Sequence, residues 1–123
     1  MKNITTKSIH KKINKSDGIR ICVMRRIRPE YDFDIWIPKL APSEKLLKQY
    51  VIQKKISWEE FSKHFIRETL LKNKAKKMIE TLVFMAQSTK ITLLCGEDSA
   101  KRCHRNLIIQ ECMKQRRSHH FDN

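Results

Sequence analysis

KITLLCG, residues 90–96, holds the most strand-like run of the chain. Residues 91–95 are β-branched or apolar without interruption, which is typical of a central strand in a parallel sheet covered on both faces. Gly96 and the two acidic residues that follow it predict a turn. Ser99 can then cap a last helix over about residues 100–116. The segment therefore predicts a strand, a turn and a helix.

The rest of the chain carries one more clear strand and three helical segments. Alternating apolar residues follow a turn at residues 16–18 and predict a strand over 19–24. Ser57 and Glu60 have the spacing of a capping box, which starts a helix with two reciprocal hydrogen bonds. The predicted helices run over residues 43–50, from 57 to about 71, and over 75–85.

Helical segments between strands favour one three-layer αβα domain of the α/β class, with a central, mainly parallel sheet. The chain of 123 residues suits a single domain with one core. The strands still needed must come from residues 3–10, as a frayed arm or a short edge strand, or from the irregular segment 25–42. We expect the basic ends, residues 1–15 and 116–123, to be loosely ordered.

Composition points to a cytoplasmic protein with anionic partners. Lys and Arg number 27 against 13 Asp and Glu, a formal net charge of +14. Such a charge favours small anionic ligands, nucleotides or nucleic acid, although the aromatic content of 7% offers few side chains for base stacking. We find no apolar run long enough for a membrane span or a signal peptide. The four cysteines lack a CxxC pair, so we expect reduced thiols.

Candidate chemistry concentrates where the best strand ends, because ligands of parallel α/β sheets bind at the carboxyl ends of the strands. Cys95 is the candidate nucleophile, while Glu97 and His104 are candidates for proton transfer. Arg105, near the start of the last helix, is the candidate anion-binding residue. Each has a purely structural alternative: Cys95 and Cys103 can be packing residues, and His104 can simply bond a nearby carbonyl.

Two sharper interpretations fit the spacing poorly. A thiol phosphatase loop needs an arginine six positions after its cysteine, but position 101 is a lysine and the arginine is Arg102. A metal site could use Cys95, Cys103 and His104. However, adjacent side chains on one helix diverge by about 100°. We therefore predict neither a metal nor a cofactor.

Several motifs, in matching order, resemble the YeaO-like family, catalogued as domain of unknown function 488. The central ones are Leu-Leu-Cys-Gly-Glu at 93–97 and Cys-His-Arg at 103–105. The others are Ser-Asp-Gly-Ile-Arg at 16–20, Leu-Ala-Pro-Ser at 40–43 preceded by Trp36, and Trp-Glu-Glu-Phe at 58–61. The resemblance covers about residues 16–112.

The resemblance implies an α/β fold with a mostly parallel sheet, but it supplies no reaction. It implies one cluster that contains Cys95, Glu97, Cys103, His104 and Arg105, together with Arg20 and with Arg25 or Arg26. The chain also departs from the family. Where the family has Asp-Arg and then Trp-Pro-Arg-Gly after the first strand, residues 24–30 read MRRIRPE and lack that Asp, Trp and Gly.

Three functional hypotheses follow. The first is an enzyme or ligand-binding domain for a small phosphate- or nucleotide-like anion, in which Cys95, Glu97 and His104 are catalytic. Arg105, Arg20, Arg25 and Cys103 would bind the ligand. The second is a basic nucleic-acid-binding module. The third is a structural network in which Arg105 bonds Glu97 or a buried carbonyl. Substrate, oligomeric state and strand order stay open.

Overall fold

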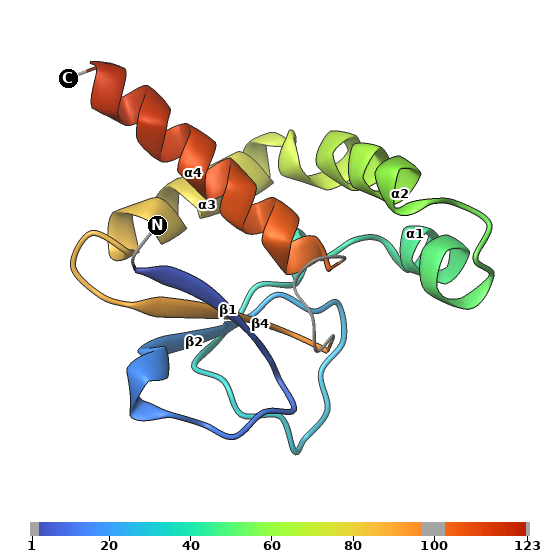
Figure 1. The fold of residues 1–123 in the computed structure, drawn as a ribbon, viewed down its shortest axis with the longest axis horizontal. Coiled ribbons are helices and arrows are strands. Elements are labelled where there is room, and N and C mark those ends of the chain that lie inside the picture. Colours follow the sequence, from blue (N-terminus) through green and yellow to red (C-terminus); the bar gives the residue numbers. More distant parts are fainter. Residues whose placement is uncertain (1–2, 97–102, 123) are drawn as a thin grey trace.

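The computed structural model describes residues 3–96 and 103–122, with side chains described as far as residue 116. Its sheet has four parallel strands in the order β1-β4-β2-β3. The strands are β1 (Ile4–Ser8), β2 (Ile19–Cys22), β3 (Ile35–Trp36) and β4 (Ile91–Cys95). The strands that the sequence left unplaced thus come from residues 3–10 and 25–42, and β1 is an edge strand (Figure 1).

The strand β4 lies at the centre of the sheet, paired with β1 on one side and β2 on the other. All five of its residues are buried, which confirms the prediction of a central strand covered on both faces. The turn before β2 needs glycine: Gly18 has a φ of +65°, and an added Cβ would lie 2.1 Å from the carbonyl oxygen of Lys90. That contact fixes the start of β2 beside the start of β4.

The first two helices begin where the sequence places their starts. Ser43 caps α1 (Glu44–Leu47), which continues as a π-helical turn, η3 (Lys48–Ile52). The capping box of Ser57 and Glu60 is formed at the start of α2 (Trp58–Phe65). The remaining helices are α3 (Asn73–Met85) and α4 (His104–Asp122), with a second π-helical turn, η4 (Ile66–Leu70), after α2.

The four helices lie on one side of the sheet (Figure 1), and their apolar faces form the core with it. The core contains residues from every helix. The sheet contributes Ile21, Ile91 and Leu93, and Val23 directly after β2 joins them. The predicted single α/β domain with a central parallel sheet is confirmed, with its α-helices on one face of the sheet and a different kind of layer on the other. There the layer consists of connections and the 3-10 helix η1 (Lys15–Asp17): Thr92 donates to the carbonyl of Asp17.

Two details differ from the sequence prediction. The segment 25–42 is not wholly irregular, because it contains β3 and the 3-10 helix η2 (Pro38–Leu40). The last helix begins at His104 among the described residues; the predicted start near Ala100 and the predicted cap Ser99 lie outside them. No helix in the described part of the chain is long and apolar enough to cross a membrane.

Candidate functional site

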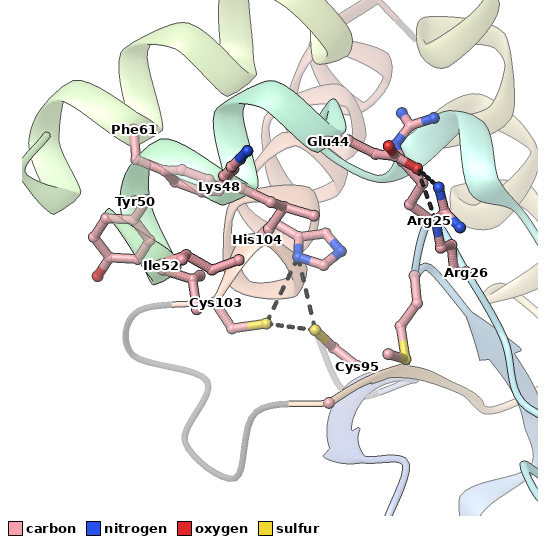
Figure 2. Close-up of a pocket in the computed structure, with 14 residues that line it drawn as sticks. Arg25, Arg26, Glu44, Lys48, Tyr50, Ile52, Phe61, Cys95, Cys103 and His104 are labelled. Atoms are coloured by element: carbon pink, nitrogen blue, oxygen red, sulfur yellow. Dashed lines mark hydrogen bonds and ion pairs between the residues drawn. The ribbon is translucent and has the colours of Figure 1, made fainter. Parts of the chain in front are cut away.

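A cavity of about 570 Å³ opens at the carboxyl end of β4, between the sheet and the helices α1 and α2 (Figure 2). Its volume falls within the range of about 300–1,000 Å³ that small-molecule sites occupy. Its walls are largely apolar, and its polar groups come from strand ends and helix starts. The lining residues include Met24, Leu47, Tyr50, Phe61, Cys95 and His104. The cavity therefore lies where the sequence argument placed the chemistry.

Two thiols and an imidazole meet at the cavity wall (Figure 2). The sulfur atoms of Cys95 and Cys103 are 2.8 Å apart, with the Cys103 thiol donating to Cys95. The Nδ1 atom of His104 lies 3.7 Å from the Cys95 sulfur and 3.8 Å from the Cys103 sulfur. All three residues are at least 94% buried, so solvent reaches them through the cavity.

The second ring nitrogen of His104 fixes which tautomer the neutral ring adopts. Nε2 lies 2.7 Å from the carbonyl oxygen of Val23, which can only accept a hydrogen bond. Nε2 therefore carries the proton, and Nδ1 of the neutral ring turns its lone pair toward the two thiols. The edge-on contact with Phe65, 5.6 Å between ring centroids, holds the ring from its other side. The alternative that His104 only bonds a carbonyl thus accounts for one nitrogen and leaves the other available.

Cys103 precedes α4 instead of lying within it, and this position explains how it reaches His104's side of the cavity. The backbone N–H of Arg105 bonds the Cys103 sulfur. The cysteine thereby acts as a cap on the start of the helix. The 100° divergence expected for neighbours on one helix does not apply to it. The hydrogen bond to Cys95, followed by burial, raises the pKa of the Cys103 thiol far above its ordinary value.

Arg105 lies behind this cluster and does not line the cavity. Its side chain is 1% exposed, and Nη1 donates to the carbonyl oxygens of Lys7 at 3.1 Å and Cys95 at 3.4 Å. It ties α4 to the ends of β1 and β4, which is the contact that the structural hypothesis expected. Nε of Arg105 is buried and has no hydrogen-bond partner within residues 3–96 and 103–116.

The rim of the cavity is basic. Arg25, Arg26 and Lys48 line it together with one described carboxylate, Glu44. The guanidinium of Arg25 donates from Nε to the carbonyl of Pro42 at 2.6 Å, which anchors it before α1. Arg26 forms an exposed ion pair with Glu44. Cationic groups thus surround an apolar cavity with thiols at its wall.

The remaining predicted residues are elsewhere. Arg20 points to the opposite face of the sheet, where Nη1 lies 2.6 Å from an Asp17 carboxylate oxygen and Nε donates to the carbonyl of Asp32. The structure therefore does not bring Arg20 to the cavity, although the resemblance implied that it would join the cluster. Glu97, the other candidate for proton transfer, lies outside the described residues.

Sequence reasoning missed the contribution of α1 and η3. Lys48, Tyr50, Val51 and Ile52 line the cavity from the π-helical turn. Val51 is 50% and Ile52 72% exposed, which is unusual for two adjacent aliphatic residues. Their presence just before the polar segment 53–55 was the available signal. A π-helical turn is frequent at functional sites, but its position is not readable from hydrophobic periodicity.

The three side chains also have the donor types that a soft metal ion takes. One sulfur from each cysteine and a nitrogen of His104 lie within 4.8 Å of one another. Tetrahedral zinc with bonds of about 2.3 Å would hold two sulfurs about 3.8 Å apart. The observed 2.8 Å is roughly 1 Å shorter than that edge. The two side chains would have to move apart by that amount to hold the ion.

The comparison with protein families decides the affiliation. A model of the DUF488-N3a family, described as the active DUF488-N3 subclade, matches residues 4–117. The chain belongs to this family. The resemblance to domain of unknown function 488 is thus confirmed, and the match includes Cys95, Cys103, His104 and Arg105. Neither the curated proteins nor the solved structures contain a match.

Proposed function

We propose that this DUF488-N3a domain is an enzyme, or a covalent ligand-binding domain, that uses the Cys95 thiol on a small anionic molecule in the cavity. The observation that carries the proposal is the orientation of His104. Nε2 is engaged by Val23, so the lone pair of Nδ1 faces both thiols. A base within reach of a thiol supports formation of the thiolate, which is the nucleophilic form of cysteine. The description of the subclade as active agrees with this assignment.

Cys95 is the better placed nucleophile of the two thiols. It ends the central strand, where its backbone is held by Arg105 and by the N–H of Ile9, which donates to the Cys95 carbonyl at 2.7 Å. Its sulfur accepts the Cys103 S–H, which stabilises negative charge on Cys95. Cys103 keeps its proton because that hydrogen bond and burial raise its pKa. The roles of attacking sulfur and hydrogen-bond donor are therefore distinct.

The cavity favours a ligand with an apolar body and a carboxylate or phosphate at one end. Met24, Leu47 and Phe61 offer apolar contact area, whereas Arg25 and Lys48 supply positive charge at the rim. In this proposal Arg25 takes the anion-binding role. Arg105 acts as a positioning residue, because it bonds carbonyls behind the cluster and does not line the cavity.

The test is site-by-site alkylation of the folded protein with neutral iodoacetamide and anionic iodoacetate, read by mass spectrometry. We expect Cys95 to react well before Cys22 and Cys112, which are fully buried. The iodoacetate-to-iodoacetamide rate ratio at Cys95 should exceed the ratio in the unfolded chain, because the rim attracts anions. Cys112→Ser is the matched control and should leave the Cys95 rate unchanged.

His104→Gln separates the two functions of the histidine. The glutamine amide can still donate to the carbonyl of Val23, but it has no basic nitrogen beside the thiols. We expect the Cys95 alkylation rate at neutral pH to fall about 100-fold, the size of a typical general-base contribution. If Cys95 stays unreactive until the protein unfolds, the thiol is a packing residue and the proposal is wrong.

A further inference from the structure

The two thiols at the cavity wall are much closer together than their proposed roles as nucleophile and hydrogen-bond donor require. Their sulfur atoms are 2.8 Å apart, whereas a disulfide bond is about 2.05 Å long. Closing the remaining 0.75 Å or so is a small adjustment for two side chains that already point at each other (Figure 2). The other two cysteines, Cys22 and Cys112, are buried on other elements and do not line the cavity.

We propose that Cys95 and Cys103 form a dithiol–disulfide pair that reduces small anionic disulfides bound in the cavity. The inference rests on the proposed function in one respect, namely that Cys95 is the attacking sulfur. It adds a substrate class and a chemical role for Cys103, which the proposed function uses only as a hydrogen-bond donor. Seven residues lie between the two cysteines in the sequence, so they do not form the CxxC pattern that marks many redox sites.

The reaction is a thiol–disulfide exchange in two displacements. The Cys95 thiolate attacks one sulfur of the substrate disulfide; the substrate S–S bond breaks, and the first thiolate leaves and takes up a proton. Cys95 then carries the second half of the substrate as a mixed disulfide. Cys103 loses its proton and attacks the Cys95 sulfur, which expels the second thiolate. Two electrons pass from the pair to the substrate, which becomes two thiols, and a low-molecular-weight dithiol returns the pair to its reduced form by the reverse steps.

The hydrogen bond between the thiols orders these two steps. In the reduced state Cys103 is held protonated chiefly by its bond to the Cys95 sulfur, so Cys95 is the first to attack. Once Cys95 is part of a mixed disulfide, its sulfur no longer bears the charge that this bond stabilises. The largest cause of the raised pKa of Cys103 is then removed. Cys103 becomes a better nucleophile at the moment when its target sulfur, still its neighbour, has become electrophilic.

The surroundings suit a disulfide that bears carboxylates. Burial of both sulfurs keeps bulky protein disulfides out, while the cavity of about 570 Å³ admits a small molecule. Arg25 and Lys48 at the rim can bind a carboxylate on the substrate. The backbone N–H of Arg105 bonds the Cys103 sulfur and can stabilise its thiolate during the second displacement.

The experiment uses Ellman's reagent, an aromatic disulfide with two carboxylates, on the folded, metal-free protein. In wild type we expect two equivalents of the coloured thiolate to be released, none to be retained, and a Cys95–Cys103 disulfide to appear on peptide mapping. Cys103→Ser should release one equivalent and retain the other half of the reagent on Cys95. Cys95→Ser should lose the fast phase, and Cys112→Ser should behave as wild type. Added dithiothreitol should restore the thiols of the wild-type protein.

The outcomes separate this inference from the proposed function. If the wild-type protein retains the reagent on Cys95 and forms no internal disulfide, Cys95 is a nucleophile but the pair does not exchange. If Cys95 does not react at all in the folded protein, the proposed function fails as well. If the thiols react only after removal of stoichiometric zinc, and then form no disulfide, the cluster is a metal site and the inference is overturned. Circular dichroism confirms that each variant is folded before labelling.

Discussion

Both faces of the sheet carry a buried arginine, but the two arginines have different partners. On the face away from the helices, Arg20 is paired with the carboxylate of Asp17, which also binds the ammonium group of Lys7. On the helix face, Arg105 bonds backbone carbonyls, and no carboxylate among the described residues pairs with it. The buried guanidinium is therefore paired with a carboxylate on the first face and bonded only to backbone carbonyls on the second.

This difference in partners indicates that the two faces of the sheet have different functions. A buried cation that is fully paired stabilises the fold only as long as its partner remains, because an isolated buried charge is costly. The helix face instead presents two thiols, a histidine whose Nδ1 faces these thiols, and a basic rim toward a cavity. We infer that the first face is structural and that the second is the place where chemistry occurs. Four measurements test this contrast.

The largest effect on stability should come from Asp17→Ala. The substitution leaves Arg20, which is 5% exposed, without its carboxylate partner and also removes the hydrogen bond to the backbone N–H of Asn14. Removing one member of a buried pair costs about 3 kcal/mol or more of the free energy of unfolding. Urea unfolding measures the loss. Alkylation of Cys95 at low urea should be unchanged, and a large change there would contradict the separation of the two faces.

Arg105→Met should cost less stability but should also disturb the site. The carbonyl oxygens of Lys7 and Cys95 lose their donor, and a hydrogen bond to a charged group contributes about 1.5–3 kcal/mol. Removal of the buried charge itself offsets part of this loss. Because Arg105 holds the end of β4, we expect the alkylation rate of Cys95 to change together with the stability. Arg20→Met is the matched control on the other face: it should lower stability and leave the alkylation rate as it is.

The stability of the first face should depend on pH. Burial alone would raise the pKa of Asp17, but hydrogen bonds from the Asn14 backbone, Lys7 and Arg20 outweigh it and lower the pKa below 3.8. The folded protein therefore holds this charge to lower pH than the unfolded chain. The resulting stability is fully present above about pH 4 and is lost as the pH falls through the folded pKa. Asp17→Asn should remove this part of the decline, as measured by unfolding at a series of pH values.

The smallest effect on stability belongs to the rim. Glu44→Gln breaks an ion pair with Arg26 whose side chains are 80% and 59% exposed, and such pairs contribute about 0–1 kcal/mol. Stability should hardly change. The freed Arg26 should however raise the rate of Cys95 with iodoacetate relative to iodoacetamide. An unchanged ratio would mean that the rim does not act on anions that enter the cavity.

What the sequence predicted well were elements with local signals. The apolar run of β4, the helix start at Ser43 and the capping box of Ser57 and Glu60 are decided by neighbouring residues, and all three are confirmed. The strand β1 is largely polar, and β3 has only two residues. Their pairing is decided by strands distant in the chain, so periodicity could name the regions that hold them but not their bounds.

In the candidate site, too, some residues could be placed from the sequence and others could not. Cys95, Cys103 and His104 are found together, as the resemblance implied, and Arg25 joins them at the rim. The place of Arg20 could not be read from its motif, because the parity of a single strand position decides which face its side chain occupies. The cavity wall formed by η3 depends on a π-helical turn and on the packing of α1 against α2, neither of which leaves a pattern in the sequence.

The site has one further property that concerns its tolerance to mutation. His104 is oriented by the carbonyl of Val23, Arg105 by those of Lys7 and Cys95, and Arg25 by those of Ala41 and Pro42. Every residue type supplies a carbonyl, so exchanges at most of these partner positions keep the hydrogen bond. Asp17, by contrast, cannot be replaced without loss of its pairs. Sequence drift can therefore reshape the cavity's surroundings while the reacting groups keep their alignment.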